Sequence, residues 1–148
     1  MLKNIPDIIS PELLKILHEM GHGDCLCIGD GNFPAASTAK FGDAEIVRLD
    51  GHKVPEILDA ILTLFPLDNF ITQPVKLMER CDGVNEPCPI WAQYEKIIAK
   101  YDERGKSAIQ FVERFAYYEE ARKCYAVVAT GETATFANII LQKGVVIH

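Results

Sequence analysis

Apolar and polar residues alternate along this chain with two periods, which predict interleaved helices and strands. Apolar residues spaced three and four apart predict helices over residues 11–20, 54–64 and 89–101, and a shorter helix is expected over 117–123. Short apolar runs predict strands over residues 25–28, 45–49, 74–79, 108–115, 125–129, 138–141 and 144–146. Strands that interleave with helices indicate an α/β domain, and we expect one mixed sheet flanked by helices on both faces.

The segments between these elements carry turn and capping signals. Ser10 can cap the first helix, Pro11 suits its first turn, and Gly21 can end it. Residues 29–34, Gly-Asp-Gly-Asn-Phe-Pro, have the composition of a loop. No internal repeat and no flexible linker divides the chain, so we predict a single domain over residues 1–148.

Composition and charge narrow the class of protein. The chain has 148 residues, of which 49% are hydrophobic and 24% charged, a balance typical of folded globular domains. Its net charge is −6 and at most two basic residues are adjacent, so we expect no nucleic-acid partner, because phosphate contacts need a basic face. The apolar runs are far shorter than the ~20 residues of a membrane span, and we expect no membrane association. The polar start of the chain differs from a secretory signal, which favours a cytoplasmic protein.

The cysteines bear on location and on metal binding: Cys25, Cys27, Cys81, Cys88 and Cys124. An odd count in a chain long enough for a full-sized core favours free thiols in a reducing cytoplasm. Cys25 and Cys27 are two apart in a predicted strand, so both lie on one face, where they act as small hydrophobic residues. The Cys-x₂-Cys spacing of zinc sites is absent, and we therefore expect no metal.

His22 is the histidine with the most suggestive surroundings, because it lies between Gly21 and Gly23 just before a predicted strand. Neither glycine has a side chain, so a ligand could approach the ring closely. An imidazole suits proton transfer near neutral pH, and Asp24 or Asp30 could orient its ring. The alternative is that His22 caps the C-terminus of the first helix, where the helix dipole favours a cation.

Two further segments concentrate polar groups near predicted strand ends. Arg114 is followed by Tyr117 and Tyr118, and a guanidinium fork with two hydroxyls suits recognition of a polyol. The alternative for this segment is ordinary packing of a surface helix. Asn138 could give one donor and one acceptor to adjacent hydroxyls, or it could cap a turn. Taken alone, each segment leaves both interpretations open.

Several longer stretches extend these signals: Ile-Ser-Pro-Glu-Leu-Leu-Lys, Glu-Met-Gly-His-Gly-Asp, Asn-Phe-Pro-Ala, Arg-Phe-Ala-Tyr-Tyr-Glu and Asn-Ile-Ile-Leu-Gln-Lys-Gly-Val. With them the chain resembles the ribose pyranase/fucose mutarotase family. The resemblance extends over residues 1–146, and only residues 81–105 match loosely.

The resemblance implies an α/β fold whose subunits assemble into a closed ring, usually a homodecamer of two stacked pentamers. It implies interconversion of the α and β anomers of a free monosaccharide such as L-fucose, ribose or galactose, without a cofactor. His22 would be the proton donor and Tyr118 a second catalytic group. We expect His22 and Asp30 to come from one subunit, with a neighbour closing the pocket. The resemblance assigns sugar binding to Asp30, Arg114, Phe136, Ala137 and Asn138.

Two residues depart from the family pattern. Phe136 stands where the family usually has tyrosine, and Asn32 where bacterial members commonly have histidine, which leaves the sugar preference open. Mutarotation needs one proton taken from the anomeric hydroxyl and one given to the ring oxygen, and acid–base side chains can do both. The alternatives are a D-ribose pyranase-type interconversion of pyranose and furanose forms, and a non-catalytic sugar-binding accessory protein.

Overall fold

The structure, a computed structural model, describes residues 1–148 and contains helices and strands that interleave along the chain. The α-helices are α1 (Pro11–Glu19), α2 (Ala35–Phe41), α3 (Val54–Leu62), α4 (Pro89–Tyr101) and α5 (Arg114–Arg122). The strands are β1 (Cys25–Gly29), β2 (Glu45–Leu49), β3 (Val75–Met78), β4 (Ile109–Val112), β5 (Ala126–Thr130) and β6 (Ile139–Gln142). A short 3-10 helix, η1 (Gly105–Ala108), precedes β4.

All six strands form one sheet, in the order β2-β5-β1-β6-β3-β4. β5 pairs in parallel with β1 and β2, and β3 pairs in parallel with β4. β6 runs antiparallel to both of its neighbours, β1 and β3. Five strands therefore point the same way, and we call the side where they end the carboxyl end of the sheet and the opposite side its amino end.

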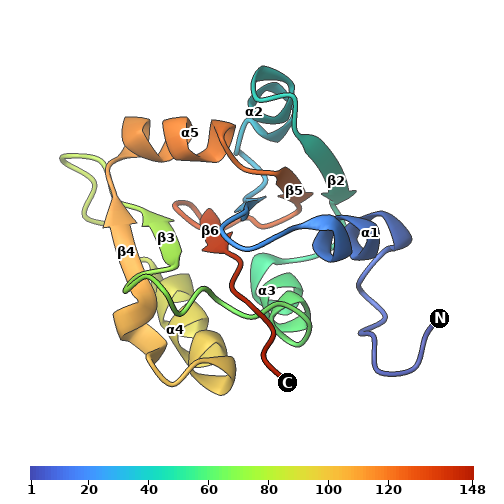
Figure 1. Cartoon of the computed structure of the whole chain (residues 1–148). Coiled ribbons are helices and arrows are strands. Elements are labelled where there is room, and N and C mark those ends of the chain that lie inside the picture. The colour runs from blue at the N-terminus through green and yellow to red at the C-terminus, as the bar shows by residue number, and fades with distance from the viewer.

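Helices cover both faces of this sheet (Figure 1). Side chains of α1, α3 and α4 join one face of the sheet in a core of 30 buried residues, and those of α2 and α5 join the other face in a core of 11. The strand period divides the side chains between the faces, as Leu26 and Ile28 belong to the larger core and Cys27 to the smaller. The predicted α/β architecture, one mixed sheet with helices on both faces, is thus confirmed.

Helix boundaries follow the capping side chains. Ser10 caps α1 as predicted, because its hydroxyl oxygen accepts the N–H of Leu13 at 3.2 Å. Glu113 caps α5 in the same manner through its carboxylate. α5 therefore begins at Arg114 and not at residue 117, and the predicted strand over 108–115 is cut short for the same reason.

Two other predictions differ from the structure. α2 was not predicted, because its seven residues are mostly small and have no side-chain cap. It packs closely on α5, since any side chain at Gly42 would collide with the carbonyl of Arg122. Residues 144–146 do not form a strand, because the pairing of β6 ends at an isolated bridge between Leu67 and Lys143.

Three observations concern membrane-spanning helices, disulfide bonds and metal sites. None of its helices combines the length and the apolar composition needed to cross a bilayer. All five cysteines carry free thiols. No three His, Cys, Asp or Glu side chains come together where they could hold a metal ion.

Candidate functional site

A small pocket opens at the carboxyl end of the sheet. It has a volume of about 220 Å³ and lies between the loop after β1, the end of β3, the first turns of α5 and the start of β6. Its lining combines a carboxylate, amides, a guanidinium and a phenol with apolar side chains: Asp30, Asn32, Phe33, Met78, Cys81, Arg114, Tyr118, Thr135, Phe136 and Asn138. Ligands of α/β sheets bind outside the carboxyl ends of the strands, and pockets for drug-sized ligands start at about 300 Å³. The location and size therefore suit a small polar molecule.

Asp30 is the acidic group of this pocket and is fixed from three sides. Its backbone N–H donates to Oδ1 of Asn138 at 2.8 Å, its Oδ1 accepts the N–H of Asn32 at 2.9 Å, and its Oδ2 accepts the N–H of Ala137 at 3.4 Å. Only 6% of the residue is exposed. This burial raises the pKa of the Asp30 carboxyl, although the backbone hydrogen bonds oppose the shift. Hydroxyl groups of a ligand would stabilise the ionised form.

Asn138 has two roles at the start of β6. Its Oδ1 accepts the N–H of Asp30, so the side chain does brace a turn. Its Nδ2 has no partner in the chain, and the residue lines the pocket. The NH₂ group can therefore donate hydrogen bonds to a ligand. The structure shows the turn-bracing role of Asn138, and sugar binding by this residue stays a prediction.

Arg114 and Tyr118 reach the pocket from the same side of α5, one helical turn apart. The carboxylate of Glu113 starts the helix by accepting the N–H groups of Phe115 and Ala116 at 3.0 Å. Nε of Arg114 donates to Oη of Tyr118 at 3.5 Å, and the guanidinium lies 5.6 Å from the centre of the tyrosine ring. Because α5 begins at Arg114, both side chains lie on the helical face that meets the pocket.

The loop between β5 and β6 forms another wall and is held by buried groups. The carboxylate of Glu132 accepts two backbone N–H groups of this loop. Phe136 has a φ of 55°, a left-handed conformation that is rare for a bulky residue. Trp91 of α4 donates its Nε1–H to the carbonyl of Phe136 at 2.8 Å, and Tyr94 donates its hydroxyl to that of Ala137 at 2.6 Å. α4 thus fixes the segment that carries the Phe136 ring.

His22 is not part of this pocket. It precedes β1 whereas Asp30 follows it, so the five residues of β1 hold them roughly 13 Å or more apart at the usual rise of a strand. The N–H of Gly23 donates to the carbonyl of Lys143 at 2.9 Å, which keeps the chain extended beyond β1. His22 therefore lies at the amino end of the sheet. The expectation that His22 and Asp30 of one subunit share a pocket is wrong for this chain.

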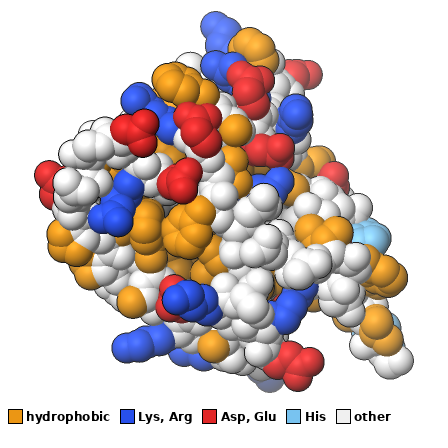
Figure 2. Space-filling view, turned by 90° about the vertical axis from the view of Figure 1, so that its left-hand side faces the viewer, with side chains coloured by type: hydrophobic (Ala, Val, Ile, Leu, Met, Phe, Trp, Pro, Cys, Tyr) orange, Lys and Arg blue, Asp and Glu red, His pale blue; other side chains and the backbone are white.

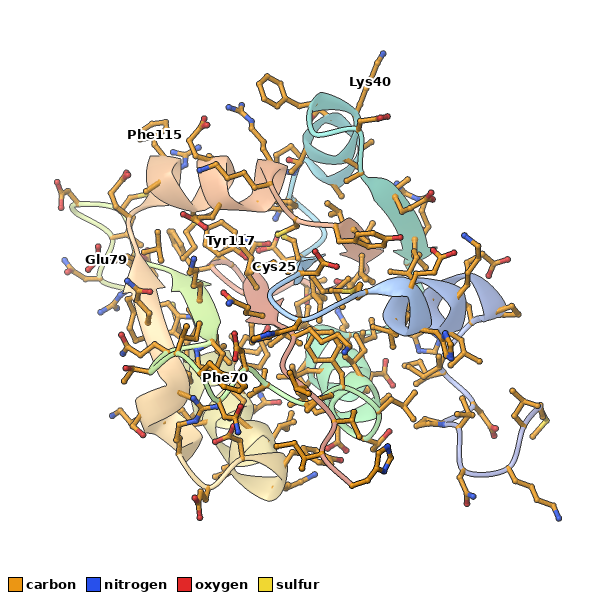
Figure 3. The ribbon with its side chains drawn as sticks, in the orientation of Figure 1. Cys25, Lys40, Phe70, Glu79, Phe115 and Tyr117 are labelled. Carbon is orange, nitrogen blue, oxygen red and sulfur yellow. The ribbon has the colours of Figure 1, made fainter.

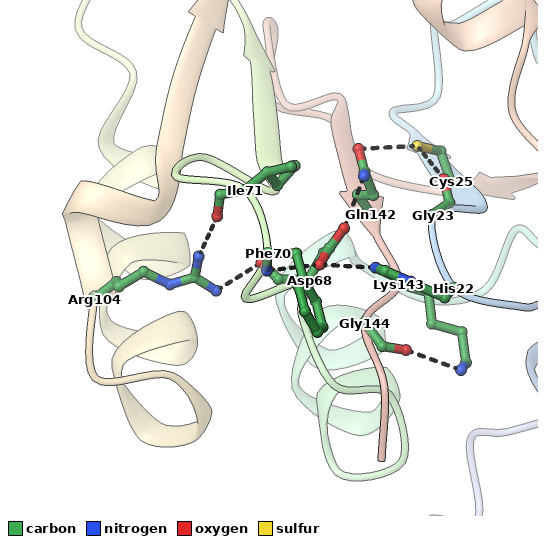
Figure 4. A network of polar contacts seen from close by, with 10 residues as sticks. All are labelled: His22, Gly23, Cys25, Asp68, Phe70, Ile71, Arg104, Gln142, Lys143 and Gly144. Atoms are coloured by element: carbon green, nitrogen blue, oxygen red, sulfur yellow. Dashed lines mark hydrogen bonds and ion pairs between the residues drawn. The ribbon is translucent and has the colours of Figure 1, made fainter. Parts of the chain in front are cut away.

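The ring of His22 binds a buried carboxylate (Figure 4). Its Nε2 lies 3.1 Å from Oδ1 of Asp68, and 46% of its side chain is exposed. α1 ends at Glu19, and the ring bonds no carbonyl of that helix, so His22 does not act as its cap. Asp24 does not orient the ring either, because its carboxylate accepts the N–H of Gly21. An accessible imidazole held by a carboxylate is an arrangement that can exchange protons.

Asp68 was not predicted from the sequence. Only 2% of it is exposed, and besides His22 it accepts the N–H of Phe70 at 2.9 Å and Nε2–H of Gln142 at 3.0 Å. Burial alone would raise the pKa of the Asp68 carboxyl, but the hydrogen bonds from Phe70, His22 and Gln142 outweigh burial and lower the pKa below its ordinary value. The residue lies between Pro66 and Pro74 in a stretch without a motif, so the sequence offered no signal for it.

Most of the predicted site residues do converge on the pocket: Asp30, Arg114, Tyr118, Phe136 and Asn138. Ala137 is fully buried and contributes its backbone N–H to Asp30. Tyr117 is also buried, with its Oη 3.9 Å from Sγ of Cys27. The strand end and loops contribute lining residues that no motif marked: Met78, Cys81 and Thr135.

Four hollows are larger but carry less chemistry, since none is lined by a buried carboxylate, and two of them illustrate this. One of about 400 Å³ lies between α2 and α5, where the Arg122 guanidinium stacks on the Phe41 ring. The other, of about 530 Å³, lies over Trp91 and Phe111. Figure 2 looks onto the side of β4 and its neighbours, where apolar side chains lie among interspersed acidic and basic ones. Neither hollow is lined by a buried carboxylate, so the pocket at Asp30 is the candidate site.

Comparison with known proteins adds a family context. The model of the RbsD / FucU transport protein family matches residues 3–146. A fucose mutarotase from Danio rerio is 45% identical over 150 residues, which cover 99% of this chain and 95% of that protein. FucU from Bifidobacterium longum has a solved structure with a TM-score of 0.96 and 56% identity, covering 98% of this chain and 100% of that one. The fucose mutarotase of Streptococcus pneumoniae, solved in complex with L-fucose, has a TM-score of 0.91 and 44% identity, covering 99% and 100%.

Proposed function

The chain belongs to the RbsD / FucU transport protein family, and from this premise we propose that it interconverts the α and β anomers of L-fucose. Relatives that match nearly its whole length are named for this activity. The observation in this chain that supports the proposal is the convergence of Asp30, Arg114 and Asn138 on one small pocket. The reaction requires only proton transfers around a bound sugar.

The pocket offers complementary groups for a deoxy sugar. Asp30 accepts hydrogen bonds from sugar hydroxyls, while Arg114 and Nδ2 of Asn138 donate to sugar oxygens. The rings of Phe33 and Phe136 line the pocket and cover the apolar C–H surface of the sugar. Such apolar walls also suit the C6 methyl group of L-fucose, where galactose carries a hydroxyl.

The main proton-transfer group comes, in this proposal, from a neighbouring subunit. His22 lies at the amino end of the sheet and Asp30 at the carboxyl end, so one chain cannot bring both to one sugar. A contact between the amino end of one subunit and the carboxyl end of the next would bring them together. Because such a contact uses two different surfaces, its repetition closes into a ring when the rotation allows.

Exposed aromatic side chains mark both surfaces. Phe70, beside His22, is 71% exposed, and Phe115, beside Arg114, is 68% exposed. Figure 3 shows these two phenylalanines far apart on the molecule. Aromatic groups are enriched where proteins meet. We therefore propose a ring-shaped homo-oligomer, a homodecamer as the family resemblance implies, in the cytoplasm, where its five free thiols stay reduced.

The reaction breaks and re-forms the C1–O5 bond of the pyranose. A base takes the proton of the anomeric hydroxyl while an acid gives a proton to the ring oxygen, which yields the open-chain aldehyde. Rotation about C1–C2 presents the other face of the carbonyl, and the reverse transfers close the ring. His22 serves as the acid at the ring oxygen, and Tyr118, whose hydroxyl is held by Arg114, takes part in the transfer at the anomeric hydroxyl.

Replacement of the histidine tests the proposal. His22→Asn keeps much of the size of the side chain but cannot transfer a proton. We expect the wild-type protein to accelerate exchange between the anomeric NMR signals of L-fucose. His22→Asn should slow this exchange by about 10²-fold or more, with sugar binding and oligomer size unchanged. Asp30→Ala should weaken binding as well, because it removes the acceptor for the sugar hydroxyls.

The same assay separates the alternatives. A protein that binds L-fucose but leaves exchange at the buffer rate would be a sugar-binding protein, and the proposal would be wrong. Exchange between pyranose and furanose signals of D-ribose, without effect on L-fucose, would point to the pyranase activity instead. If His22→Asn exchanged the anomers of L-fucose at the wild-type rate, His22 would have no role in the proton transfer.

A further inference from the structure

Glu132 is a buried carboxylate in the loop between β5 and β6, and its side chain does not line the pocket at Asp30. We propose that Glu132 is a positioning residue, whose carboxylate fixes this loop so that Phe136 and the N–H group of Ala137 are held in one arrangement around the sugar and Asp30. The inference rests on the proposed function, because it specifies what holds one wall of the sugar site. Glu132 itself touches no sugar and acts only through the loop.

The carboxylate of Glu132 joins two segments that are far apart in the sequence. Its Oε1 accepts the N–H groups of Thr133 and Ala134 at 2.8 and 2.9 Å. Its Oε2 accepts the N–H of Val54, the first residue of α3, at 3.3 Å. All three contacts are donors, which suits a carboxylate, because an ionised carboxyl group only accepts hydrogen bonds. The side chain therefore ties the start of the loop to the start of α3.

This carboxylate is buried without a cation to pair with it. Only 7% of Glu132 is exposed, and none of the ion pairs of the chain includes it. Nζ of Lys53 donates instead to the carbonyl of Gly131 at 2.8 Å and to Oγ1 of Thr133 at 3.1 Å. A buried charge without an ion pair depends on its hydrogen bonds. The N–H donors must therefore stay in place, and this requirement holds the loop in one conformation.

The backbone of Glu132 is also bonded to the loop that carries Asp30. Its carbonyl accepts the N–H of Gly31 at 2.8 Å, and a Cβ atom at Gly31 would lie only 2.9 Å from this oxygen. Its N–H donates to Oγ1 of Thr130 at 3.2 Å, and this hydroxyl donates in turn to the carbonyl of Gly29 at 2.8 Å. Glu132 thus lies where the two loops of the pocket meet, so a shift of one loop is passed to the other.

The far end of the same loop reaches the sugar pocket. The side chain of Phe136 lines the pocket, and the N–H of Ala137 donates to Oδ2 of Asp30 at 3.4 Å. Ala134, the last residue bonded to the carboxylate, is two residues before Phe136. α4 holds this end through the carbonyl groups of Phe136 and Ala137. The loop is therefore fixed at both ends, by the carboxylate at its start and by α4 at its far end.

A purely structural role for Glu132 is the competing explanation, since its hydrogen bonds also stabilise the fold. The two roles differ for Glu132→Gln, which keeps the length of the side chain but replaces one acceptor oxygen by an NH₂ group. At least one of the three N–H groups then loses its partner. A structural role lowers the free energy of unfolding and leaves the sugar site of the folded protein unchanged. A positioning role alters the sugar site while the protein is still folded.

Anomer exchange of L-fucose, measured by NMR over a range of sugar concentrations, separates KM from kcat. We expect KM to rise roughly threefold to tenfold in Glu132→Gln, because Phe136 and Asp30 are no longer held in one arrangement. kcat should stay within about twofold, because the carboxylate bonds neither of the proposed proton-transfer groups, His22 and Tyr118. Urea unfolding would establish that the variant is folded under the conditions of the assay.

Hydrogen exchange at single amides provides a readout that does not depend on catalysis. In the wild type we expect the N–H groups of Thr133 and Ala134 to be protected from exchange with solvent. In Glu132→Gln these groups and the N–H of Ala137 should exchange about tenfold faster, while the amides of β1 keep their wild-type rates. A general loss of stability would instead speed exchange in β1 as well.

Glu56→Gln is the matched control. The carboxylate of Glu56 also accepts a backbone N–H at the start of α3, that of Lys53 at 2.8 Å, but it bonds neither loop of the pocket. The variant therefore makes the same change of charge at the same end of the same helix. KM, kcat and the exchange of the Thr133 and Ala134 amides should all match the wild type.

Several results would overturn the proposal. Wild-type amides of Thr133 and Ala134 that exchange as fast as those of an unfolded peptide would do so directly, so the test survives if Glu132→Gln fails to fold. An unchanged KM in folded Glu132→Gln, or an equal rise of KM in Glu56→Gln, would do so as well. If the wild-type protein neither binds L-fucose nor exchanges its anomers, the proposed function is wrong, while hydrogen exchange still decides whether Glu132 holds the loop.

Discussion

At the scale of single residues, Asp30 and Asp68 show that burial alone does not decide the state of a carboxyl group. Both are almost fully buried. At Asp30 burial outweighs the backbone hydrogen bonds and raises the pKa, whereas at Asp68 the donors Phe70, His22 and Gln142 outweigh burial and lower the pKa. Asp68 therefore stays an ionised partner of His22 at neutral pH, and Asp30 is the carboxyl that acid neutralises first.

The affinity for L-fucose should consequently fall as the pH drops through the pKa of Asp30. The raised pKa means that protonation begins at a higher pH than for an aspartate with the ordinary value of 3.8. Sugar hydroxyls that donate to the carboxylate favour its ionised form, so binding must weaken as the proton is taken up. Calorimetric titrations between about pH 7 and about pH 4 should show this loss for the wild type and a flat profile for Asp30→Asn. If the affinities of the wild type and of Asp30→Asn changed with pH in the same way, Asp30 would be excluded as the hydrogen-bond acceptor for the sugar hydroxyls.

At the scale of elements, α4 supports the pocket through hydrogen bonds to the loop before β6. Trp91 and Tyr94 donate to the carbonyls of Phe136 and Ala137. The left-handed backbone of Phe136 costs on the order of 1–3 kcal/mol. The hydrogen bond from Trp91 offsets part of this cost and keeps the ring at the pocket wall.

Trp91→Phe should therefore loosen this wall. The variant keeps an aromatic ring but loses the N–H, so we expect the affinity for L-fucose to fall by ~0.5–1.5 kcal/mol, the net contribution of one hydrogen bond. Phe111→Leu is the control, because Phe111 packs edge-on against Trp91 at 4.9 Å but makes no bond to the loop. Calorimetry and urea unfolding would measure affinity and stability. Equal losses of affinity in both variants would show that packing, not the hydrogen bond, supports the wall.

Elements whose apolar residues repeat over several helical turns were predictable from the sequence. Elements whose bounds depend on contacts with other residues were not. The prediction for α4, residues 89–101, matches the structure because its inner face repeats over three turns. α5 starts three residues early because Glu113 caps it, and the small residues of α2 carry no period. Within the site, Asp30 and Asn138 adjoin strand ends that the sequence reveals. The pairing of His22 with Asp68 spans 46 residues and depends on how Arg104 holds the intervening loop, which no local pattern encodes.

At the scale of the whole molecule, the two groups proposed for one reaction lie at opposite ends of the sheet. The pocket contains Asp30, Arg114 and Asn138, while His22 with Asp68 forms the opposite half. If each active site takes one half from each of two neighbouring subunits, a subunit that is defective in one half still offers an intact other half.

Mixing two inactive variants should therefore restore activity. When His22→Asn and Asp30→Ala subunits are unfolded, mixed in equal amounts and refolded together, about a quarter of the sites combine an intact His22 with an intact Asp30. We expect L-fucose anomer exchange at about a quarter of the wild-type rate per site, measured by NMR. Each variant refolded alone provides the control. Mixtures no more active than the variants alone would show that both residues serve a site within one subunit.

The position of β6 also has a consequence for the order in which the chain folds. β6 is the last strand along the sequence, yet it lies in the middle of the sheet, between β1 and β3. Without it, β2, β5 and β1 form one part of the sheet and β3 and β4 another, and no strand pairing joins the two parts. A chain growing on the ribosome can therefore hold only two separate part-sheets until residues 139–142 emerge. Asn138 directly precedes this segment and Gln142 is its last residue, so the pocket and the hydrogen bonds of Asp68 become ordered in the same late folding step.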